Sequence, residues 1–305
     1  MNSEILFWIG FNVFVLLMLT LDLGVFHKKA HDVSIKEAVI WSAVWIFLAM
    51  VFNVIVYFNF GSQKAFEFLT GYLIEKSLSV DNIFVFVLVF GYFQIPNKYQ
   101  HKVLFWGIIG ALVMRIIFIV AGVSLIQQFH WTIYIFGAFL VFTGIKMITQ
   151  KDKKMEPEKN PVVRLARKFF SVTDNLHGDK FFVRQDGKKY VTPLFLVLIL
   201  IEVTDLIFAV DSIPAILAIT QDRFIVYTSN VFAILGLRSL YFALAHIVHR
   251  FIYLSYGLAV ILMFVGTKMM LVDFFKIPVY VSLIIIAFIL SVSIILSLLK
   301  TKSAD

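Results

Sequence analysis

Six carboxylates occur inside stretches of this chain that are otherwise apolar enough to cross a membrane: Asp22, Glu75, Asp81, Glu202, Asp205 and Asp211. An ionised side chain at the centre of a bilayer costs about 2.5–3.5 kcal/mol on insertion scales, so such an acid faces a partner, a cavity or an ion. Four of the six form two copies of one pattern, EKSLSVDNIF and DLIFAVDSIP. We therefore expect the acids to line a cation site.

The available ligands limit the kind of cation. Sites made only of oxygen ligands suit Mg, Ca and Mn, whereas Zn and Cu sites recruit His or Cys. The chain has no cysteine, and its seven histidines lie in expected loops or near the ends of expected spans. The sequence thus favours Mn2+, Ca2+ or Mg2+ as a bound or transported ion. It indicates no prosthetic group, and thiol redox chemistry is absent.

The composition is that of an integral membrane protein, with 61% hydrophobic residues and 34 phenylalanines in 305 residues. A helix needs about 20 apolar residues to span a bilayer. Apolar runs near this length predict an all-α polytopic protein with about nine transmembrane helices, at residues 5–26, 38–60, 66–93, 103–127, 130–149, 193–219, 224–247, 251–271 and 277–299. The first run lacks the basic start and the cleavage site of a signal peptide, so we expect it to stay attached.

Lysine and arginine are distributed unevenly between the two expected sides of the membrane. Excluding the long 150–192 segment, loops on the side of the C-terminus hold eight and the other side holds three, Lys64, Arg223 and Lys276. Basic residues concentrate on the cytoplasmic side, so we expect the N-terminus outside and the C-terminus in the cytoplasm of a bacterial inner membrane protein. The net charge of +8 then reflects topology, and no nucleic-acid partner is expected.

The 150–192 segment is the one sizeable stretch outside the expected spans. It begins with a charged, proline-bearing linker, and FFVRQDGKKYV alternates around Asp186-Gly187, the preferred sequence of a two-residue hairpin turn. We expect a cytoplasmic loop with a β-hairpin, which covers the bundle or docks a protein partner.

An internal repeat extends beyond the acids. SVDNI at 79–83 matches AVDSI at 209–213, Arg115 has a counterpart in Arg238, and FTGIKMI at 142–148 echoes FVGTKMM at 264–270. Two three-helix repeats, 66–149 and 193–271, follow N-terminal helices at 1–60, and 277–305 adds a last helix and tail. Three spans per unit require the copies to be inverted, the plan of secondary transporters with a midplane site.

Helical geometry places conditions on that site. Acids six residues apart lie about 240° apart around an ideal helix, so Glu75 and Asp81 share a site only if their helix is bent or broken, and the same holds for Asp205 and Asp211. Pro214 frees the carbonyl beside Asp211. We therefore expect two antiparallel broken helices. Glu202 should join Asp205, and Asp22 should line the cytoplasmic entrance.

Internal salt bridges are the competing explanation for the acids. Arg115, Arg238 and Lys76 are available at depth, and Lys146 and Lys268 stand near span ends, where we expect them to reach water. That leaves a surplus of acid, with Arg115 and Arg238 neutralising part of it and holding helices together. Asn82 and Ser212 directly follow the repeated aspartates and are expected to support the site.

LTGYLIEKSLSVDNIFVF, IYIFGAFLVFTGIKM, LILIEVTDLIFAVDSIPAI, SNVFAILGLRSLYF and GLAVILMFVGTKM resemble the TerC family of integral membrane proteins, particularly its Alx-type members. The resemblance covers nearly the whole chain. It implies a bacterial inner membrane location and manganese export, with the in-membrane acids as transport residues. Glu75, Asp81, Glu202, Asp205 and Asp211 match its motifs, and Asp22 is a weaker match.

The function hypothesis from sequence is therefore a secondary exporter of a divalent metal, above all Mn2+, with protons as counter-ions. Carboxylates in a low-dielectric cavity can bind protons and a divalent ion in turn. The alternative is a membrane partner protein that delivers metal to exported proteins, with the 150–192 loop as docking surface. An enzyme is not expected, because no nucleophile-and-base set or phosphate-binding loop occurs.

Overall fold

The computed structural model describes residues 3–21, 33–149, 168, 170–173, 175–185, 188–245, 251–275 and 277–302. These form a helical bundle with one small hairpin. The helices are α1 (Ser3–Leu21), α2 (Ile35–Phe60), α3 (Ser62–Tyr92), α4 (Asn97–Gln128), α5 (Thr132–Thr149), α7 (Pro193–Leu217), α8 (Arg223–Leu235), α9 (Leu237–Leu244), α10 (Leu254–Met270) and α11 (Val279–Lys302). The strands are β1 (Phe182–Gln185) and β2 (Lys188–Val191).

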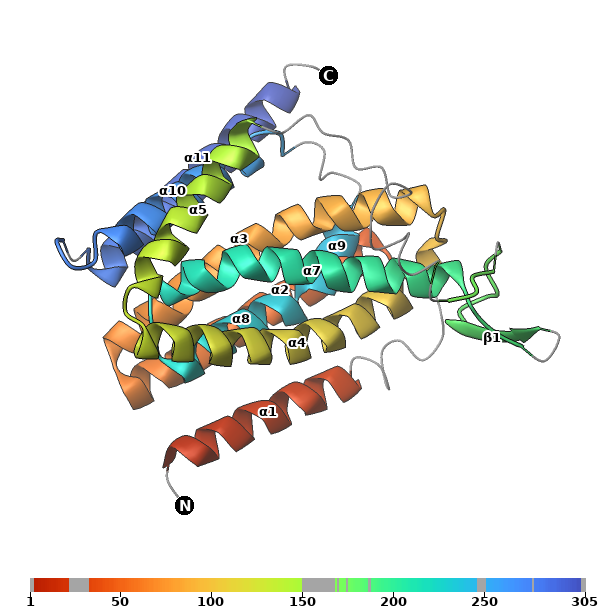
Figure 1. Cartoon of the computed structure of the whole chain (residues 1–305), viewed down its shortest axis with the longest axis horizontal. Coiled ribbons are helices and arrows are strands. Elements are labelled where there is room, and N and C mark those ends of the chain that lie inside the picture. The colour runs from red at the N-terminus through yellow and green to blue at the C-terminus, as the bar shows by residue number, and fades with distance from the viewer. Residues whose placement is uncertain are drawn as a thin grey trace.

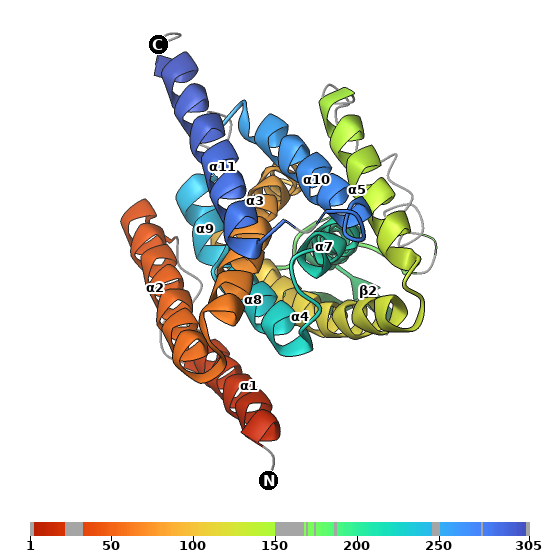
Figure 2. The ribbon, with the colours of Figure 1, turned by 90° about the vertical axis from the view of Figure 1, so that its left-hand side faces the viewer.

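The helices form three groups. α3, α4, α7 and α8 pack on one another in the centre, with α3 and α7 running in opposite directions (Figure 1). α1 and α2 lie on one side of this centre, whereas α5, α10 and α11 form an inclined group on the other side (Figure 2). The centre therefore brings the helices that carry the repeated acids together.

The apolar surface of the bundle supports membrane insertion. Among the described residues, six helical segments are long and apolar enough to span a bilayer, namely α2, α4, α5, α7, the α8–α9 pair and α11. Large apolar side chains such as Phe58, Phe47 and Leu16 are exposed, as on a lipid-facing surface. The chain is thus a multi-pass α-helical membrane protein.

Each of the nine predicted spans is helical over its described part, with differences in detail. The apolar segments of α1 and α10, Ile5–Thr20 and Leu254–Met270, are shorter than the six that could span a bilayer, and α3 carries several charges along its length. The predicted 224–247 span is two helices that meet at Gly236. A Cβ at Gly236 would stand 2.7 Å from the Lys76 ammonium nitrogen and 3.2 Å from the Trp45 Cβ, so only glycine leaves room for this close approach.

The predicted breaks in the acid-bearing helices are wrong. α3 is one uninterrupted helix from Ser62 to Tyr92, and α7 continues past Pro214 to Leu217. Pro214 lies near the end of its helix, so only the last turn is affected by the hydrogen bond that proline cannot donate. Acids six residues apart therefore point to different sides of a continuous helix.

α5 and α10 approach closely through small residues. A Cβ at Gly144 would stand 2.7 Å from the carbonyl oxygen of Ala259, and one at Gly137 would stand 2.8 Å from that of Gly266. The repeated motifs pair Gly144 with Gly266 and Gly137 with Ala259. Replacing each residue by its counterpart in the repeat therefore converts the Gly144–Ala259 contact into the Gly266–Gly137 contact. An internal two-fold axis between α5 and α10 would relate the two contacts in the same way.

The hairpin lies at the end of the bundle opposite the start of α1 (Figure 1). β1 and β2 pair antiparallel with Val183 opposite Tyr190, while the predicted turn residues Asp186 and Gly187 lie outside the described residues. Lys102 of α4 binds the Asp179 carboxylate at 2.8 Å. The Phe182 ring lies 4.7 Å from that of Phe195 on α7, so the hairpin is fixed to the bundle.

Candidate functional site

Arg115 of α4 joins an acid of α3 to an acid of α7 in the centre of the bundle. Its Nη1 donates to Glu75 Oε1 at 2.7 Å. Its Nη2 donates to Asp205 Oδ1 at 3.2 Å and its Nε to Asp205 Oδ2 at 3.4 Å. Arg115 was expected from the sequence to neutralise part of the acid cluster. The structure places its guanidinium between Glu75 and Asp205, which occupy equivalent positions in the repeat.

Three polar side chains complete what we call the Arg115 cluster. Asn230 Nδ2 donates to Glu75 Oε2 at 3.0 Å, and Asn82 Nδ2 donates to Asp205 Oδ1 at 3.3 Å. Ser212 Oγ accepts from Arg115 Nη1 at 3.0 Å. The cluster therefore consists of Glu75, Asn82, Arg115, Asp205, Ser212 and Asn230, from helices α3, α4, α7 and α8.

The Arg115 cluster is almost completely removed from the surface. The side chains of Arg115 and Glu75 are each 1% exposed and that of Asp205 is 7% exposed. Each carboxylate oxygen accepts at least one hydrogen bond, which is the condition for keeping buried charges in a folded protein. Two acids against one guanidinium still leave one negative charge in excess when both are ionised.

Two buried amide oxygens in the cluster accept no hydrogen bond from the residues that the structure describes. Asn82 Oδ1 and Asn230 Oδ1 have no hydrogen-bond partner within the described part of the chain, and the two residues are 1% and 0% exposed. Buried polar atoms are nearly always paired, so exceptions call for an explanation. Carbonyl-type oxygens beside two carboxylates are the donor set of a hard cation such as Mn2+, Mg2+ or Ca2+.

The contacts of the cluster respect the internal repeat. The repeat pairs Glu75 with Asp205 and Asn82 with Ser212. Asn82 donates to Asp205, and Ser212 is close enough to Glu75 to influence its carboxylate. The two acids that the sequence repeat pairs thus each have a polar neighbour from the other copy.

Two predicted acids lie elsewhere around α7. Asp211 is half-buried and interacts with Thr143 and Lys146 of α5, on a different side of the helix from Asp205. Glu202 is half-buried against α4, where its carboxylate fills the space that a side chain at Gly110 would need. It is close enough to Asp205 to be influenced by that charge. Of the described acids that were expected to share the site, Glu75 and Asp205 meet, Glu202 lies near Asp205, and Asp211 faces α5 instead.

The remaining two acids are not placed in the site. Asp22 lies outside the described residues, and Asp81 belongs to α3 but its side chain is not described. In the described part of the chain, no group of three or more His, Cys, Asp or Glu side chains has the arrangement of a metal site. With Arg115 between Glu75 and Asp205, a divalent ion could reach both carboxylates only after the guanidinium withdrew.

The other predicted bases have different environments. Lys76 donates to the carbonyl oxygen of Ala233, near the end of α8, at 3.3 Å. Arg238 of α9 is buried and lines a small cavity together with Asp205. Lys146 is exposed as expected, but Lys268 is only 9% exposed and donates to Ser282 Oγ at 2.9 Å. The expectation that Lys268 reaches water is wrong, because α11 covers this end of α10.

A second charged group lies two turns from Glu75 on α3. It was not predicted from the sequence. Lys64 Nζ binds Glu67 Oε2 at 2.9 Å and Asp222 Oδ2 at 3.1 Å. Thr220 donates to Glu67 Oε2 at 2.6 Å and Gln63 to Glu67 Oε1 at 3.1 Å. We call these five residues the Lys64 cluster. Glu67 falls within the predicted 66–93 span, and its eight-residue spacing from Glu75 was the available signal.

Comparison with known proteins assigns the family. The model of the integral membrane protein TerC family matches residues 60–305, so the chain belongs to this family and the predicted resemblance is confirmed. An uncharacterized membrane protein of Myxococcus xanthus is 54% identical over 297 residues, covering 97% of this chain and 93% of the relative. No solved structure matches.

Two further relatives extend the comparison. The putative membrane-bound redox modulator Alx of Escherichia coli K12 is 49% identical over 301 residues, covering 96% of this chain and 94% of the relative. An uncharacterized membrane protein of Rickettsia bellii is 46% identical over 298 residues, covering 98% and 99% of the two chains. The similarity therefore extends over the whole bundle, including α1 and α2, which precede the residues that the family model matches.

Proposed function

We propose that this protein is a secondary transporter that exports a divalent cation, Mn2+ above all, from the cytoplasm in exchange for protons. The observation that carries the proposal is the Arg115 cluster, in which two buried acids from antiparallel helices share one guanidinium. Buried acids at membrane depth mark ion pathways. Their excess negative charge and the two unpaired amide oxygens supply ligands for a hard cation.

In this mechanism Arg115 acts as a tethered counter-charge. While its guanidinium lies between Glu75 and Asp205, their charges are compensated and the cluster is closed to a cation. Withdrawal of the guanidinium would expose two carboxylates together with the amide oxygens of Asn82 and Asn230. A divalent ion or protons would then restore charge balance, because unpaired buried carboxylates are strongly unfavourable. This competition would couple metal movement to proton movement.

The inverted repeat supports alternating access. Inverted repeats meet at a midplane site and move against each other in secondary transporters. The exchanged contacts Asn82–Asp205 and Ser212–Glu75, and those of Gly144 and Gly137 across α5 and α10, are what such a repeat predicts. We place the N-terminus outside and the C-terminus in the cytoplasm of a bacterial inner membrane.

A direct thiol redox role does not fit this chain. Some relatives are named putative redox modulators, but the sequence contains no cysteine, so it cannot form or exchange disulfides. Manganese is favoured over calcium and magnesium by the family resemblance alone, since all three accept oxygen ligands.

The experiment is Mn2+ flux in proteoliposomes of the purified protein under an imposed pH gradient. We expect flux that follows the gradient, with Mg2+ and Ca2+ tested as competitors. Glu75→Gln keeps the shape of the side chain but removes its charge and should abolish flux. Lys98→Gln removes a charge at an exposed position in the first turn of α4 and should not alter the flux. Flux that is absent in the wild type, or unchanged in Glu75→Gln, would contradict the proposal.

The basic hairpin supports a second candidate, a protein that docks a partner and passes metal to it. Arg184, Lys188 and Lys189 are exposed on β1 and β2. Deletion of residues 181–191 separates the two functions. A transporter should keep gradient-driven Mn2+ flux after the deletion, whereas a docking protein should show no flux before or after it.

A further inference from the structure

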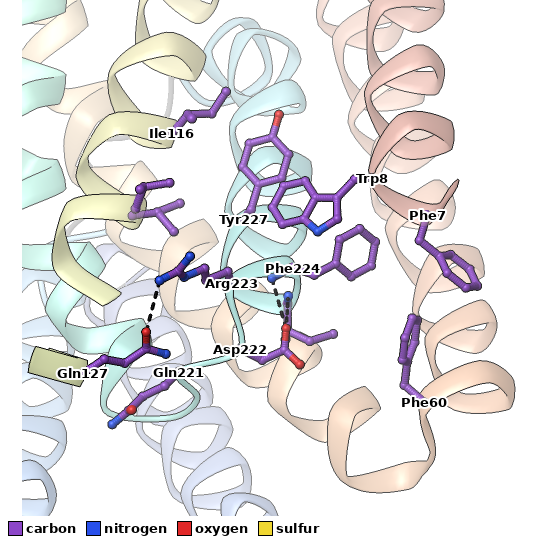
Figure 3. A pocket seen from close by; sticks show the side chains of 13 residues that line it. Phe7, Trp8, Phe60, Ile116, Gln127, Gln221, Asp222, Arg223, Phe224 and Tyr227 are labelled. Atoms are coloured by element: carbon purple, nitrogen blue, oxygen red, sulfur yellow. Dashed lines mark hydrogen bonds between the residues drawn. The ribbon is translucent and has the colours of Figure 1, made fainter. Parts of the chain in front are cut away.

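A cavity of about 630 Å3 lies between α1, α4 and α8, outside the Arg115 cluster. Figure 3 shows Trp8 of α1 and Tyr227 of α8 facing Ile116 of α4 across it, with Arg223 and Gln127 toward its other end. One end of the cavity is therefore apolar and aromatic and the other end is polar. Its lining includes Phe7 and Trp8 near the start of α1, and α1 begins at the end of the bundle opposite the hairpin (Figure 1).

The polar end carries a positive charge. The Arg223 guanidinium donates to Gln127 Oε1 at 3.1 Å and to Ser124 Oγ at 3.4 Å, and no carboxylate pairs with it within the described residues. Its neighbour Asp222 is engaged elsewhere, because Oδ1 caps α8 through the Phe224 N–H at 3.0 Å and Oδ2 binds Lys64. Arg223 is exposed, so its remaining N–H groups are available to an anion.

The apolar end opens toward the lipid. Ile116 and Val120 line the cavity and are 42% and 47% exposed on α4. On the opposite side the rings of Trp8 and Tyr227 stack at 5.3 Å, and aromatic residues of this kind lie at membrane interfaces. This end therefore has the apolar lining that a hydrocarbon chain would require.

A second groove of about 410 Å3 runs along the other side of α1, between α1 and α2. Its lining is entirely apolar and includes Gly10, Phe14 and Leu48. Phe7 lines both the cavity and this groove. The apolar end of the cavity and the apolar groove thus flank α1 and share Phe7, and Arg223 is the one cationic side chain among their described lining residues.

We propose that this surface binds one anionic diacyl phospholipid, with its phosphate on Arg223 and one acyl chain on each side of α1. Guanidinium and phosphate form paired, charge-assisted hydrogen bonds, and Gln127 and Gln221 offer further polar contacts at the headgroup. The occupant is a lipid because the groove and one end of the cavity are apolar, while the other end of the cavity carries the Arg223 guanidinium. The inference does not depend on the transport function.

Native mass spectrometry of the detergent-solubilised protein with dioleoyl phosphatidylglycerol tests the proposal. We expect one lipid retained per chain and about tenfold weaker retention by Arg223→Gln, since a charged hydrogen bond is worth about one power of ten in affinity. Arg223→Lys should keep part of the binding. Lys98→Gln removes an exposed positive charge from the other end of α4 and should bind like the wild type.

A second variant tests the acyl-chain channels. A Cβ at Gly10 meets nothing within 4 Å, so Gly10→Leu fills the groove without disturbing the fold. It should weaken binding of the diacyl lipid but not of the single-chain lysophosphatidylglycerol. Equal retention of phosphatidylglycerol by wild type and Arg223→Gln would overturn the proposal. Equal retention of uncharged dioleoylglycerol, or displacement by millimolar inorganic phosphate alone, would also overturn it.

Discussion

The Arg115 cluster and the Lys64 cluster have the same plan in different surroundings. In each, one base joins an acid of α3 to a second acid, at 2.7 and 3.2 Å for Arg115 and at 2.9 and 3.1 Å for Lys64. Their bases differ in exposure, because Arg115 is 1% exposed whereas Lys64 is 31% exposed. Asp222 is 32% exposed, while Glu67, at 5%, is as buried as Asp205, at 7%. Similar distances therefore hide a large difference in the solvation of the two bases.

This difference explains why different bases are used. Deep in the bundle, a base must satisfy several acceptors at once, and the planar guanidinium has five donors in a fixed geometry. Near the end of the bundle, water can complete the hydration of an ammonium group, and Lys64 is sufficient. Movement of Arg115 would leave two buried acids uncompensated, whereas in the Lys64 cluster Glu67 is buried and Asp222 is partly exposed. For this reason our proposal assigns the cation site to the Arg115 cluster.

The largest expected effect is that of Arg115→Gln. It leaves Glu75 and Asp205 buried and facing each other without a cation, and breaking a buried ion pair in this way costs about 3–5 kcal/mol of the free energy of unfolding. Thermal unfolding in detergent measures the loss. The double variant Arg115→Gln/Asp205→Asn should recover part of it, because one buried charge is removed. No recovery would mean that charge is not the cause.

Asn230→Leu should have the next largest effect. The change is nearly equal in volume but leaves Glu75 Oε2 without its donor, and an unsatisfied buried acceptor costs about 1–3 kcal/mol. In the Lys64 cluster the matched change is Thr220→Val, after which Glu67 Oε2 still binds Lys64. Thermal unfolding of both variants ranks the two clusters. Equal losses would contradict the expectation that Lys64 keeps Glu67 Oε2 satisfied.

Lys64→Met should cost at most about 1 kcal/mol, the usual value for partly exposed ion pairs. Glu67 keeps its hydrogen bonds from Gln63 and Thr220. Because salt screens exposed charges, the difference between variant and wild type should shrink when unfolding is measured in high salt. A loss as large as that of Arg115→Gln would show that the Lys64 cluster is not solvated as its exposure indicates.

The smallest effect belongs to an exposed pair outside both clusters, Lys102 and Asp179. The hydrogen bond from Lys102 lowers the pKa of Asp179 below its ordinary value. The pair therefore stabilises the hairpin above the ordinary carboxyl pKa of about 3.9, and this contribution is lost as the pH falls through the lowered value. Hydrogen exchange of β1 should show a small acid-induced loosening, which Asp179→Asn abolishes. Identical pH profiles would exclude the linkage.

The acids of the cluster could be predicted because charges in apolar spans are conspicuous and two of them repeat. Glu75, Asp205 and Arg115 stand out by these signals, and they meet in the structure. Helical geometry also predicted that acids six residues apart would need a bent or broken helix to meet. Both helices are continuous, and Asp211 instead contacts α5, because packing against a neighbouring helix offered a polar partner.

Asn230 and the Lys64 cluster show what the sequence could not provide. Asn230 has no acid nearby in the sequence, and its partner Glu75 is 155 residues away. Lys64 was counted among the loop residues from the sequence. In the structure Lys64 lies in the first turn of α3 beside Glu67. Such contacts depend on how helices pack, and they cannot be predicted from the residue types alone.

The most direct measurement compares Mn2+ flux in proteoliposomes containing Asp205→Asn or Asp222→Asn. Each variant removes one charge from one of the two clusters, and the asparagine introduced by Asp222→Asn can still cap α8, since asparagine is as good a capping residue as aspartate. We expect Asp205→Asn to abolish flux driven by the pH gradient and Asp222→Asn to retain it. Folded Asp205→Asn protein that moves Mn2+ at the wild-type rate would contradict the assignment of the cation site to the Arg115 cluster.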